Sequence, residues 1–440
     1  MPRATAGPPV ESAARGPSEV ALAYLASDGR VAIVNDYGSG RSEARWDPDP
    51  ASLPEVASAW RASPARTGVG PLDAEEAVEG YGVFTFPYGP ISMGVPESGR
   101  FDLRTYGERI LALTPFVGYK SRRIVASVVG QRPEDAALRI ERLAGNFAAA
   151  HASAFLAAVE SARRSAVPRG ELWVRALAQE LQRIYNHLHV IARVAEAASQ
   201  NVGAAQTHAL AEELLRLEGS VFGHRWLFGA LLPEGPARRL ERSQRRELAV
   251  RCGELSDRFD RLWELFLESR TFIDRIQSTA PVPRDLAVRW GGVGPTLRAS
   301  GVPWDDRLRV PVAPYTDLFL DLPHESGGDA LARLLVRAHE IRASHLLVEQ
   351  MLDRWPGDPS VPEDPGPAIA PGRGLGRVES PSGDLVYDVS MEDDRIVAVG
   401  LRTASRANFP LFARGLRDGV FTDFHFAWES FGLVFAEVDA

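Results

Sequence analysis

The chain has 440 residues, of which 45% are hydrophobic and 25% charged, and these ordinary values exclude a disordered or collagen-like chain. Its formal charge of -8 at pH 7 provides no electrostatic footprint for nucleic acid, so we expect no nucleic-acid partner. The sequence contains no run of about 18 or more apolar residues and no signal peptide at its start, which predicts a cytoplasmic protein.

The first part of the chain is predicted to be rich in β-structure. Its first twenty residues are rich in Pro, Ala and Gly and predict a mobile tail. Residues 21–38 contain two short apolar runs around Ser-Asp-Gly, which indicates a hairpin. Residues 79–103 are β-like and interrupted by Gly and Pro, which predicts strands joined by tight turns.

From about residue 132 the hydrophobic period changes to that of a helix. One apolar stripe within residues 171–199 consists of Leu177, Leu181, Ile184, Leu188, Ile191 and Ala195. Further helical segments are expected at about 204–220, 237–277 and 328–353, joined by loops that contain Gly and Pro. Residues 132–353 therefore predict an antiparallel helical bundle.

The C-terminal part returns to β-structure after a Pro-rich connection at 355–374. Short β-runs around Pro-Ser-Gly and Glu-Asp-Asp turns predict a meander at about 374–404. We thus expect an α+β fold with a central antiparallel helical bundle and small β-rich N-terminal and C-terminal parts. Residues 1–80 would form a variable tail and short β-rich segment, and residues 81–440 the main domain.

The sequence shows no clear motif for a disulfide, a thiolate cluster, a dinucleotide site or a histidine-based metal site. The single cysteine, Cys252, excludes a disulfide or an iron-sulfur cluster on thiolates of this chain, and its helical spacing from Leu248 and Leu255 predicts a buried side chain. Gly-Arg-Gly-Leu-Gly at 372–376 lacks the preceding strand and following helix of a dinucleotide site. The nine histidines show no metalloprotease spacing, and adjacent acids such as Asp305-Asp306 and Asp393-Asp394 usually mark solvated faces or turns.

One histidine lies on a predicted apolar row. His151 shares its helical face with Leu143, Phe147, Phe155 and Val159. A polar side chain at a core position is either satisfied by buried partners or remains from a binding site, and the pattern alone leaves both alternatives open.

Six stretches, taken in order, resemble a known family. They are GPISMGVPESGRF (89–101), GERI (107–110), RALAQELQRIYNHL (175–188), EELLRLEGSVFGHRWLFGALLPEG (212–235), GVGPTLRASGVPWDDR (292–307) and GRVESPSGDLVYDV (376–389). Together they resemble the large subunits of energy-converting (group 4, formate-hydrogenlyase-type) nickel-iron hydrogenases and the homologous quinone-site subunit of respiratory complex I. The resemblance covers roughly residues 80–440.

The metal ligands of the hydrogenases are missing from the matching positions. The resemblance implies two Cys-x-x-Cys pairs, at which this chain has Ala144 and Phe147 near the start of a helix and Val434 and Glu437 near the C-terminus. Nickel and iron in such a site require soft sulfur ligands, which these residues do not provide. We therefore expect no metal, no cofactor bound by this chain alone and no hydrogenase activity.

The complex I relatives also lack the thiolates and hold a quinone headgroup between a histidine and a tyrosine. Here the tyrosine position aligns with Gly145, and the histidine position falls near Ser92 or Arg100. Arg100 could donate hydrogen bonds to a quinone oxygen. The resemblance predicts that Ser92, Arg100, Asn146, His151 and Glu437 converge on one pocket, with Asp423 as a further candidate; we favour structural roles for His151, Asp423 and Glu437.

Two functions follow from the resemblance. The first is a component of a complex I-like, membrane-associated oxidoreductase that docks beside an iron-sulfur small subunit and lines a quinone pocket, peripheral to the inner membrane through membrane-arm subunits. The alternative is a non-catalytic structural subunit of a complex I-related or antiporter-linked assembly, with the pocket closed by Phe147 and its neighbours.

Overall fold

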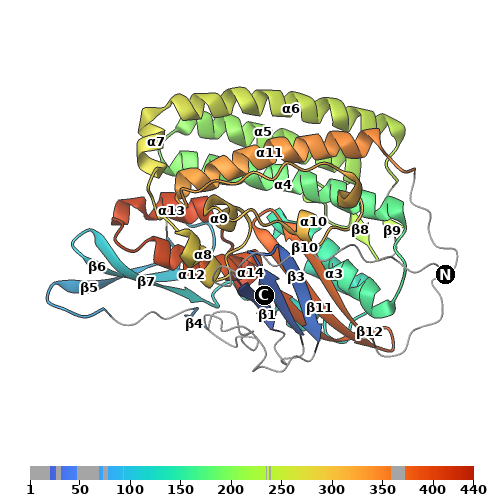
Figure 1. The fold of residues 1–440 in the computed structure, drawn as a ribbon, viewed down its shortest axis with the longest axis horizontal. Coiled ribbons are helices and arrows are strands. Elements are labelled where there is room, and N and C mark those ends of the chain that lie inside the picture. Colours follow the sequence, from blue (N-terminus) through green and yellow to red (C-terminus); the bar gives the residue numbers. More distant parts are fainter. Residues whose placement is uncertain are drawn as a thin grey trace, which may run out of the picture.

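The computed structural model describes residues 20–25, 31–46, 69–72, 78–92, 94–233, 235–236, 239–357 and 372–440. The predicted tail, except for its last residue, and most of the Pro-rich connection lie outside these ranges, as does much of the predicted 1–80 segment. The described residues form a layer of long helices over a lower layer of small sheets and short helices (Figure 1). This arrangement confirms the α+β fold.

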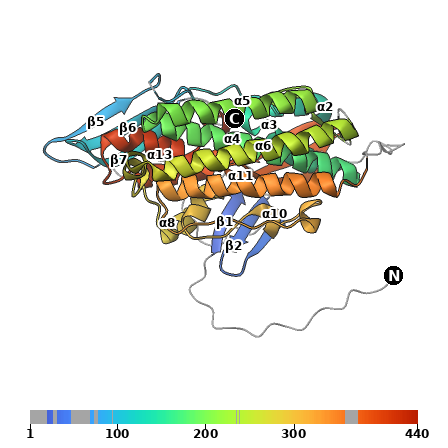
Figure 2. The ribbon, with the colours of Figure 1, turned by 90° about the horizontal axis from the view of Figure 1, so that it is seen from above.

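Four long helices form the upper layer (Figures 1 and 2). Their bounds are Arg169–Ala197 (α4), Asn201–Phe222 (α5), Arg242–Glu268 (α6) and Ala330–Asp353 (α11). Helices α5 and α11 each contact both α4 and α6, which closes a four-helix bundle. The predicted stripe on α4 is buried, as Leu181 and Ile184 illustrate with 0% exposure.

The predicted helical segment at 237–277 is shorter and divided. Helix α6 begins only at Arg242, after a capping box formed by Glu241 and Gln244, and α7 (Arg270–Ile276) follows a break. The break occurs at Ser269, whose backbone is extended with a ψ of 97°. Cys252 is 1% exposed on α6, which confirms its predicted burial, and burial raises the pKa of its thiol to about 12.

A three-stranded antiparallel meander forms the C-terminal sheet. Strands β10 (Gly372–Ser380), β11 (Gly383–Glu392) and β12 (Arg395–Arg402) pair in sequence order. Asp393 and Asp394 form the turn between β11 and β12 with positive φ angles of 47° and 58°, as their sequence predicts. This sheet lies at the predicted position.

The glycines of the 372–376 stretch bring β10 against helix α3 (Ala148–Arg163). A Cβ atom on Gly374 or Gly376 would lie 2.0 or 1.9 Å from a backbone carbonyl oxygen of α3. Glycine in a strand commonly marks such a close approach of another backbone. The stretch therefore positions α3 on the meander, and with it the chain around His151.

The N-terminal hairpin is confirmed by its pairing. Strands β1 (Val20–Leu25), β2 (Val31–Asp36) and β3 (Arg41–Trp46) form an antiparallel sheet, although the predicted turn at 26–30 lies outside the described residues.

A third sheet contains β6 and the strands that flank it. It has the order β4-β7-β6-β5, with bounds Gly70–Pro71 (β4), Val83–Tyr88 (β5), Arg100–Tyr106 (β6) and Arg109–Val117 (β7). Its end projects to the left in Figure 1. The C-terminal helices α12 (Ala404–Gly415), α13 (Phe424–Phe431) and α14 (Phe435–Val438) share a buried core with it.

Shorter elements complete the fold. They are α1 (Ile124–Ser127), α2 (Pro133–Ile140), η3 (Gly145–Phe147), β8 (Leu231–Leu232), β9 (Gly235–Pro236), α8 (Arg284–Arg289), α9 (Gly294–Ala299), α10 (Asp306–Arg309), η4 (Tyr315–Asp317) and η5 (Phe421–Asp423).

The expectation of a solvated Asp305-Asp306 pair is wrong. Their exposures are 0% and 4%. Asp305 Oδ2 lies 2.7 Å from Arg307 Nη2, and Asp306 Oδ1 lies 2.7 Å from Arg377 Nη2. Buried carboxylates are tolerated when paired in this way, and arginines distant in sequence supply part of the compensation.

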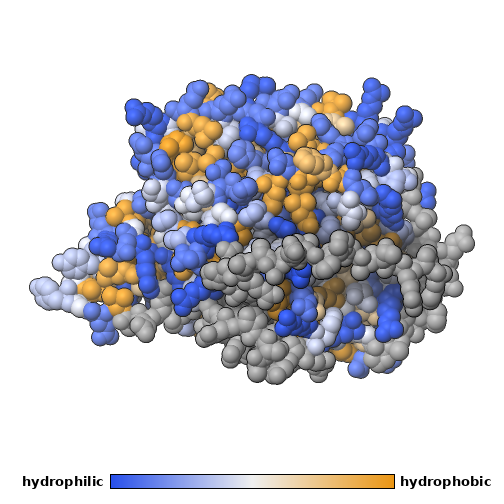
Figure 3. All heavy atoms as spheres, viewed as in Figure 1, coloured by the Kyte–Doolittle hydropathy of each residue, from blue (hydrophilic) through white to orange (hydrophobic). Residues whose placement is uncertain are grey.

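The surface is mostly hydrophilic on the face in Figure 3, with separate apolar patches. None of the helices in the described ranges is both long and apolar enough to cross a membrane.

Candidate functional site

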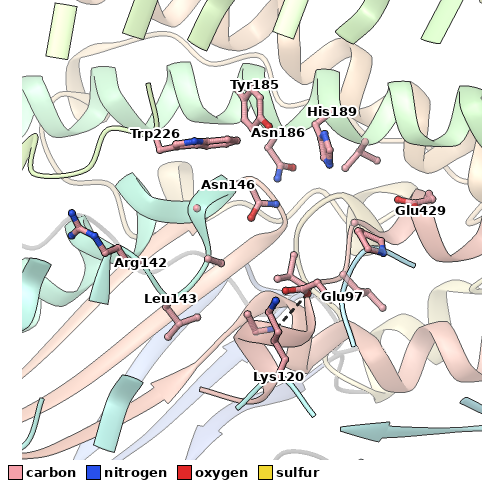
Figure 4. Close-up of a pocket in the computed structure, with 18 of the residues that line it drawn as sticks. Glu97, Lys120, Arg142, Leu143, Asn146, Tyr185, Asn186, His189, Trp226 and Glu429 are labelled. Atoms are coloured by element: carbon pink, nitrogen blue, oxygen red, sulfur yellow. Dashed lines mark hydrogen bonds between the residues drawn. The ribbon is translucent and has the colours of Figure 1, made fainter. Parts of the chain in front are cut away.

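A cavity of about 610 Å³ opens where residues 142–146, which include the start of η3, meet helix α4 and the C-terminal segment (Figure 4). Its lining consists of Pro96, Glu97, Lys120, Arg122, residues 142–146, Tyr185, Asn186, His189, Val190, Trp226, Phe228, Trp428, Glu429, residues 432–434 and Ala436. These residues belong to segments that are far apart in sequence, so only the folded chain forms the cavity.

Gly145 leaves room on one wall. A Cβ atom at this position would lie 3.9 Å from the ring atoms of Trp226 and Phe228, so a larger side chain would extend into the cavity. The neighbouring Phe147 is 0% exposed and packs into an apolar cluster with Leu143 and Ala144. Phe147 is absent from the lining, and the cavity remains beside it.

Helix α4 provides the polar wall. Tyr185 and His189 are one turn apart, so they lie on the same helical face. Their rings stack with centroids 6.0 Å apart and an interplanar angle of 17°. Trp226 meets the Tyr185 ring edge-on at 5.2 Å. Figure 4 shows His189, Asn186 and Asn146 directed toward the same space.

This wall is uncharged at neutral pH. Burial raises the pKa of Tyr185, so its hydroxyl keeps its proton. Burial, with smaller contributions from the positive charges of His208 and Arg193, lowers the pKa of His189 to about 4. A neutral imidazole can donate from one ring nitrogen and accept at the other. The cavity therefore offers neutral hydrogen-bonding groups beside aromatic rings.

Other residues that line the cavity are ionisable. The carboxylate of Glu97 accepts hydrogen bonds from the backbone N–H groups of Phe435 at 2.6 Å and Ala436 at 3.4 Å, and burial raises its pKa. The guanidinium of Arg142 lies 4.7 Å from the centre of the Phe228 ring, and Lys120 lines the same side as Glu97. The cavity therefore combines these charged groups with the uncharged wall of α4.

His151 and Glu437 come together as predicted, but outside the cavity lining. His151 is 0% exposed, with Nδ1 2.8 Å from the hydroxyl of Tyr387 and Nε2 3.3 Å from Glu437 Oε1. The other carboxylate oxygen of Glu437 accepts hydrogen bonds from the backbone and the hydroxyl of Ser405. These contacts fit the structural roles that we favour for both residues.

The other predicted site residues lie in several different places. Asn146 lines the cavity. Arg100 lies on β6, with Nη2 3.0 Å from Asp102 Oδ2 and its guanidinium 4.1 Å from the centre of the Phe116 ring. Ser92 lies beside Tyr88 and bridges to Val95, and Asp423 lies in η5 near Arg275. The six candidates thus occupy several places, and the five-residue convergence is only partial.

The four positions that the resemblance assigns to thiolates do lie near one another. Ala144 and Phe147 share an apolar cluster against which Val434 packs, and Ala144 and Val434 both line the cavity. Glu437 is bonded to Ser405 instead. Alkyl and aromatic groups cannot replace thiolates as ligands of nickel and iron, so these residues do not fit that metal centre.

Sequence reasoning missed Tyr185, His189 and Trp226. His187, two residues before His189 on α4, points to another side of the helix, where its Nε2 lies 2.7 Å from Glu340 Oε2 in the protein interior. The available signal was the spacing of four between Tyr185 and His189. That signal does not tell which side of α4 faces a cavity.

Comparisons with known proteins agree with the fold. The family described as "Respiratory-chain NADH dehydrogenase, 49 Kd subunit" matches residues 205–371. The chain is 30% identical over 353 residues to an NADH-quinone oxidoreductase subunit of Anaeromyxobacter dehalogenans, covering 75% of this chain and 87% of that protein. It is 28% identical over 325 residues to the alpha subunit of a membrane-bound hydrogenase of Pyrococcus furiosus, covering 70% and 76%.

A solved structure shares the fold. It is a chain of the membrane-bound sulfane sulfur reductase, an archaeal respiratory membrane complex, with a TM-score of 0.76 and 22% identity. The match covers 81% of this chain and 98% of that chain.

Proposed function

Because the chain belongs to the family of the 49 kDa subunit of respiratory-chain NADH dehydrogenase, we propose that it is a metal-free component of a complex I-like, membrane-associated oxidoreductase. In this proposal it docks beside an iron-sulfur subunit and lines a pocket for a quinone-type acceptor. Partner subunits attach it to the membrane.

The single observation that carries the proposal is the cavity at Ala144 and Val434. Its aromatic side chains, Trp226 and Phe228, suit a flat ring, and its neutral groups on Tyr185 and His189 suit the oxygens of that ring. Its volume of about 610 Å³ is in the range of small-molecule sites, which runs from about 300 to 1,000 Å³.

Electrons must come from another chain in this proposal. The only cysteine, Cys252, is buried in α6, so this chain cannot hold an iron-sulfur cluster on thiolates of its own. The role of the chain is to bind the acceptor, orient it and exclude water, while the partner subunit supplies the reducing equivalents.

The alternative is a non-catalytic structural subunit. It is favoured by the packed side chains of Phe147 and Glu437, which occupy two of the four positions that hold ligands in the hydrogenases. Under this alternative the cavity has no functional ligand.

Isolation of the native complex through an affinity tag on this chain tests the proposal. Its subunits are identified by mass spectrometry, and the complex is labelled with an azidoquinone photoprobe. We expect an iron-sulfur subunit in the complex. We also expect covalent label on residues 142–146, 185–190 or 226–228, and excess decylubiquinone present during photolysis should prevent this labelling. A complex without an iron-sulfur subunit, or label confined to other chains, would favour the structural alternative.

A further inference from the structure

Glu429 of α13 lies between two cavities. It lines the site cavity, and it also lines a second cavity of about 410 Å³ together with Gly94, Arg193 and His425. Figure 4 shows Glu429 beyond His189, at the end of the view opposite Arg142. One carboxyl group thus borders both spaces.

One oxygen of this carboxyl group is held by Arg193. Oε1 of Glu429 accepts hydrogen bonds from Nη2 of Arg193 at 2.8 Å and from Nε at 3.3 Å. The same guanidinium donates to the carbonyl of Gly94 at 3.0 Å and pairs with Glu196 at 2.8 Å. No hydrogen bond to Oε2 is found within the described ranges, so this oxygen can carry a proton without breaking the pair with Arg193.

The carboxyl group can exchange a proton at neutral pH. Burial raises the pKa of Glu429 to about 7, although the charge of Arg193 opposes this shift. The side chain is 11% exposed. Both protonation states are therefore populated near pH 7, which is the condition for an efficient general acid.

Other charged or titratable groups line the same two cavities or contact the neighbours of Glu429. Helix α4 contributes His189, Arg193 and Glu196, and α13 itself contributes His425. Glu97 lies before β6 and Lys120 after β7. From α11, Arg333 contacts Ser430 and Arg337 contacts Phe431, the residues that follow Glu429. His189 and His425 both have pKa values lowered by burial, so they are neutral near pH 7.

We propose that Glu429 transfers protons from the second cavity to the acceptor bound in the site cavity. This inference rests on the proposed function and adds the residue through which its protons enter. Reduction of a quinone to a hydroquinone consumes two electrons and two protons. The electrons come from the iron-sulfur partner. Glu429 gives one proton at a time to a quinone oxygen, and its carboxylate takes up a replacement from solvent in the second cavity.

The test uses the native complex with dithionite-reduced methyl viologen as the donor and decylubiquinone as the acceptor, assayed from pH 5.5 to 8.5. Glu429→Gln keeps a side chain that can bond to Arg193 but cannot release a carboxyl proton. We expect about a 100-fold lower kcat, the scale of lost general acid catalysis, with an unchanged KM and without the wild-type pH dependence near 7. Glu429→Asp should retain the pH dependence at a reduced rate.

The matched control is Glu213→Gln. Glu213 also pairs with an arginine, Arg258 at 2.7 Å, but it lies outside the lining of both cavities. Its variant should keep the wild-type rate. If wild-type complex reduces decylubiquinone and Glu429→Gln does so with the same kcat and pH profile, the proton-transfer role is wrong while the proposed function stands. If wild-type complex does not reduce the quinone, the proposed function itself fails.

Discussion

The hydroxyl of Tyr387 on β11 and Nδ1 of His151 on α3 are 2.8 Å apart in the buried interface between the meander and the helix. This contact satisfies one ring nitrogen of the histidine that occupies the apolar row of α3. The contact also links α3, which follows the cavity-lining residues 142–146, to the C-terminal sheet.

Tyr387→Phe should destabilise the chain. The variant leaves Nδ1 of His151 buried without its partner, and an unsatisfied buried polar group costs about 1 to 3 kcal/mol. The free energy of unfolding in urea measures this loss. Tyr106→Phe, at a position that is 60% exposed, serves as the control and should change little. Equal stability of the two variants would contradict the contact.

Replacement of Gly376 and of Gly253 by alanine should have opposite effects on the stability of the folded chain. The Cβ of Gly376→Ala would lie 1.9 Å from the carbonyl oxygen of Ala154, so β10 must move away from α3, at a cost of about 1 to 3 kcal/mol. Apart from the chain neighbours and the backbone of α6 itself, no heavy atom of the described residues lies within 4 Å of the corresponding position on Gly253, in the middle of α6. Gly253→Ala should therefore raise stability by about 0.5 to 1 kcal/mol. Thermal unfolding of both variants checks the signs.

His345 should contribute to acid sensitivity. Burial lowers its pKa in the folded chain from 6.5 to about 4, so the unfolded chain binds a proton between these values that the folded chain does not. This contribution to stability is present above pH 6.5 and is lost as the pH falls toward 4. Between pH 6.5 and pH 4, the free energy of unfolding of His345→Leu should therefore fall less steeply with decreasing pH than that of the wild type. The difference between the two slopes should be up to about 1.4 kcal/mol per pH unit.

Urea titrations at several pH values test this slope. His324→Leu, at an exposed position, is the control and should keep the wild-type slope. An unchanged slope in the His345 variant would mean that the imidazole is protonated equally well in both states.

The purified chain should contain no stoichiometric nickel or iron. The reason is the donor set, since Ala144, Phe147 and Val434 provide no ligand atom and Glu437 only a hard oxygen. Elemental analysis of protein produced with the hydrogenase maturation machinery present gives the answer. A content of one nickel per chain would contradict this prediction.

The sequence predicts the architecture well because period and spacing are local properties. The stripe on α4 and the alternation in β10 to β12 each require only nearby residues. The break at Ser269 is harder to predict, because no proline or glycine marks it. The burial of Asp305 and Asp306 depends partly on Arg298 and Arg377, whose proximity only the fold establishes.

The site is predicted only in part, because it too depends on contacts between residues that are distant in sequence. The resemblance locates the region through Ala144 and Asn146, which do line the cavity. It cannot show that Arg100 pairs with Asp102 on the sheet, or that Tyr185 and His189 face the cavity from α4. Those outcomes depend on which faces of distant elements pack together.

The central claim, that a quinone-type acceptor occupies this cavity, is tested most directly by filling the cavity. Gly145→Leu would extend a side chain toward Trp226 and Phe228, and Gly253→Leu, in open space on α6, is the matched control. The measurement is decylubiquinone reduction by native complexes that retain all their subunits. We predict a large loss of rate in the Gly145 variant alone, whereas equal rates in both variants would contradict an acceptor site in this cavity.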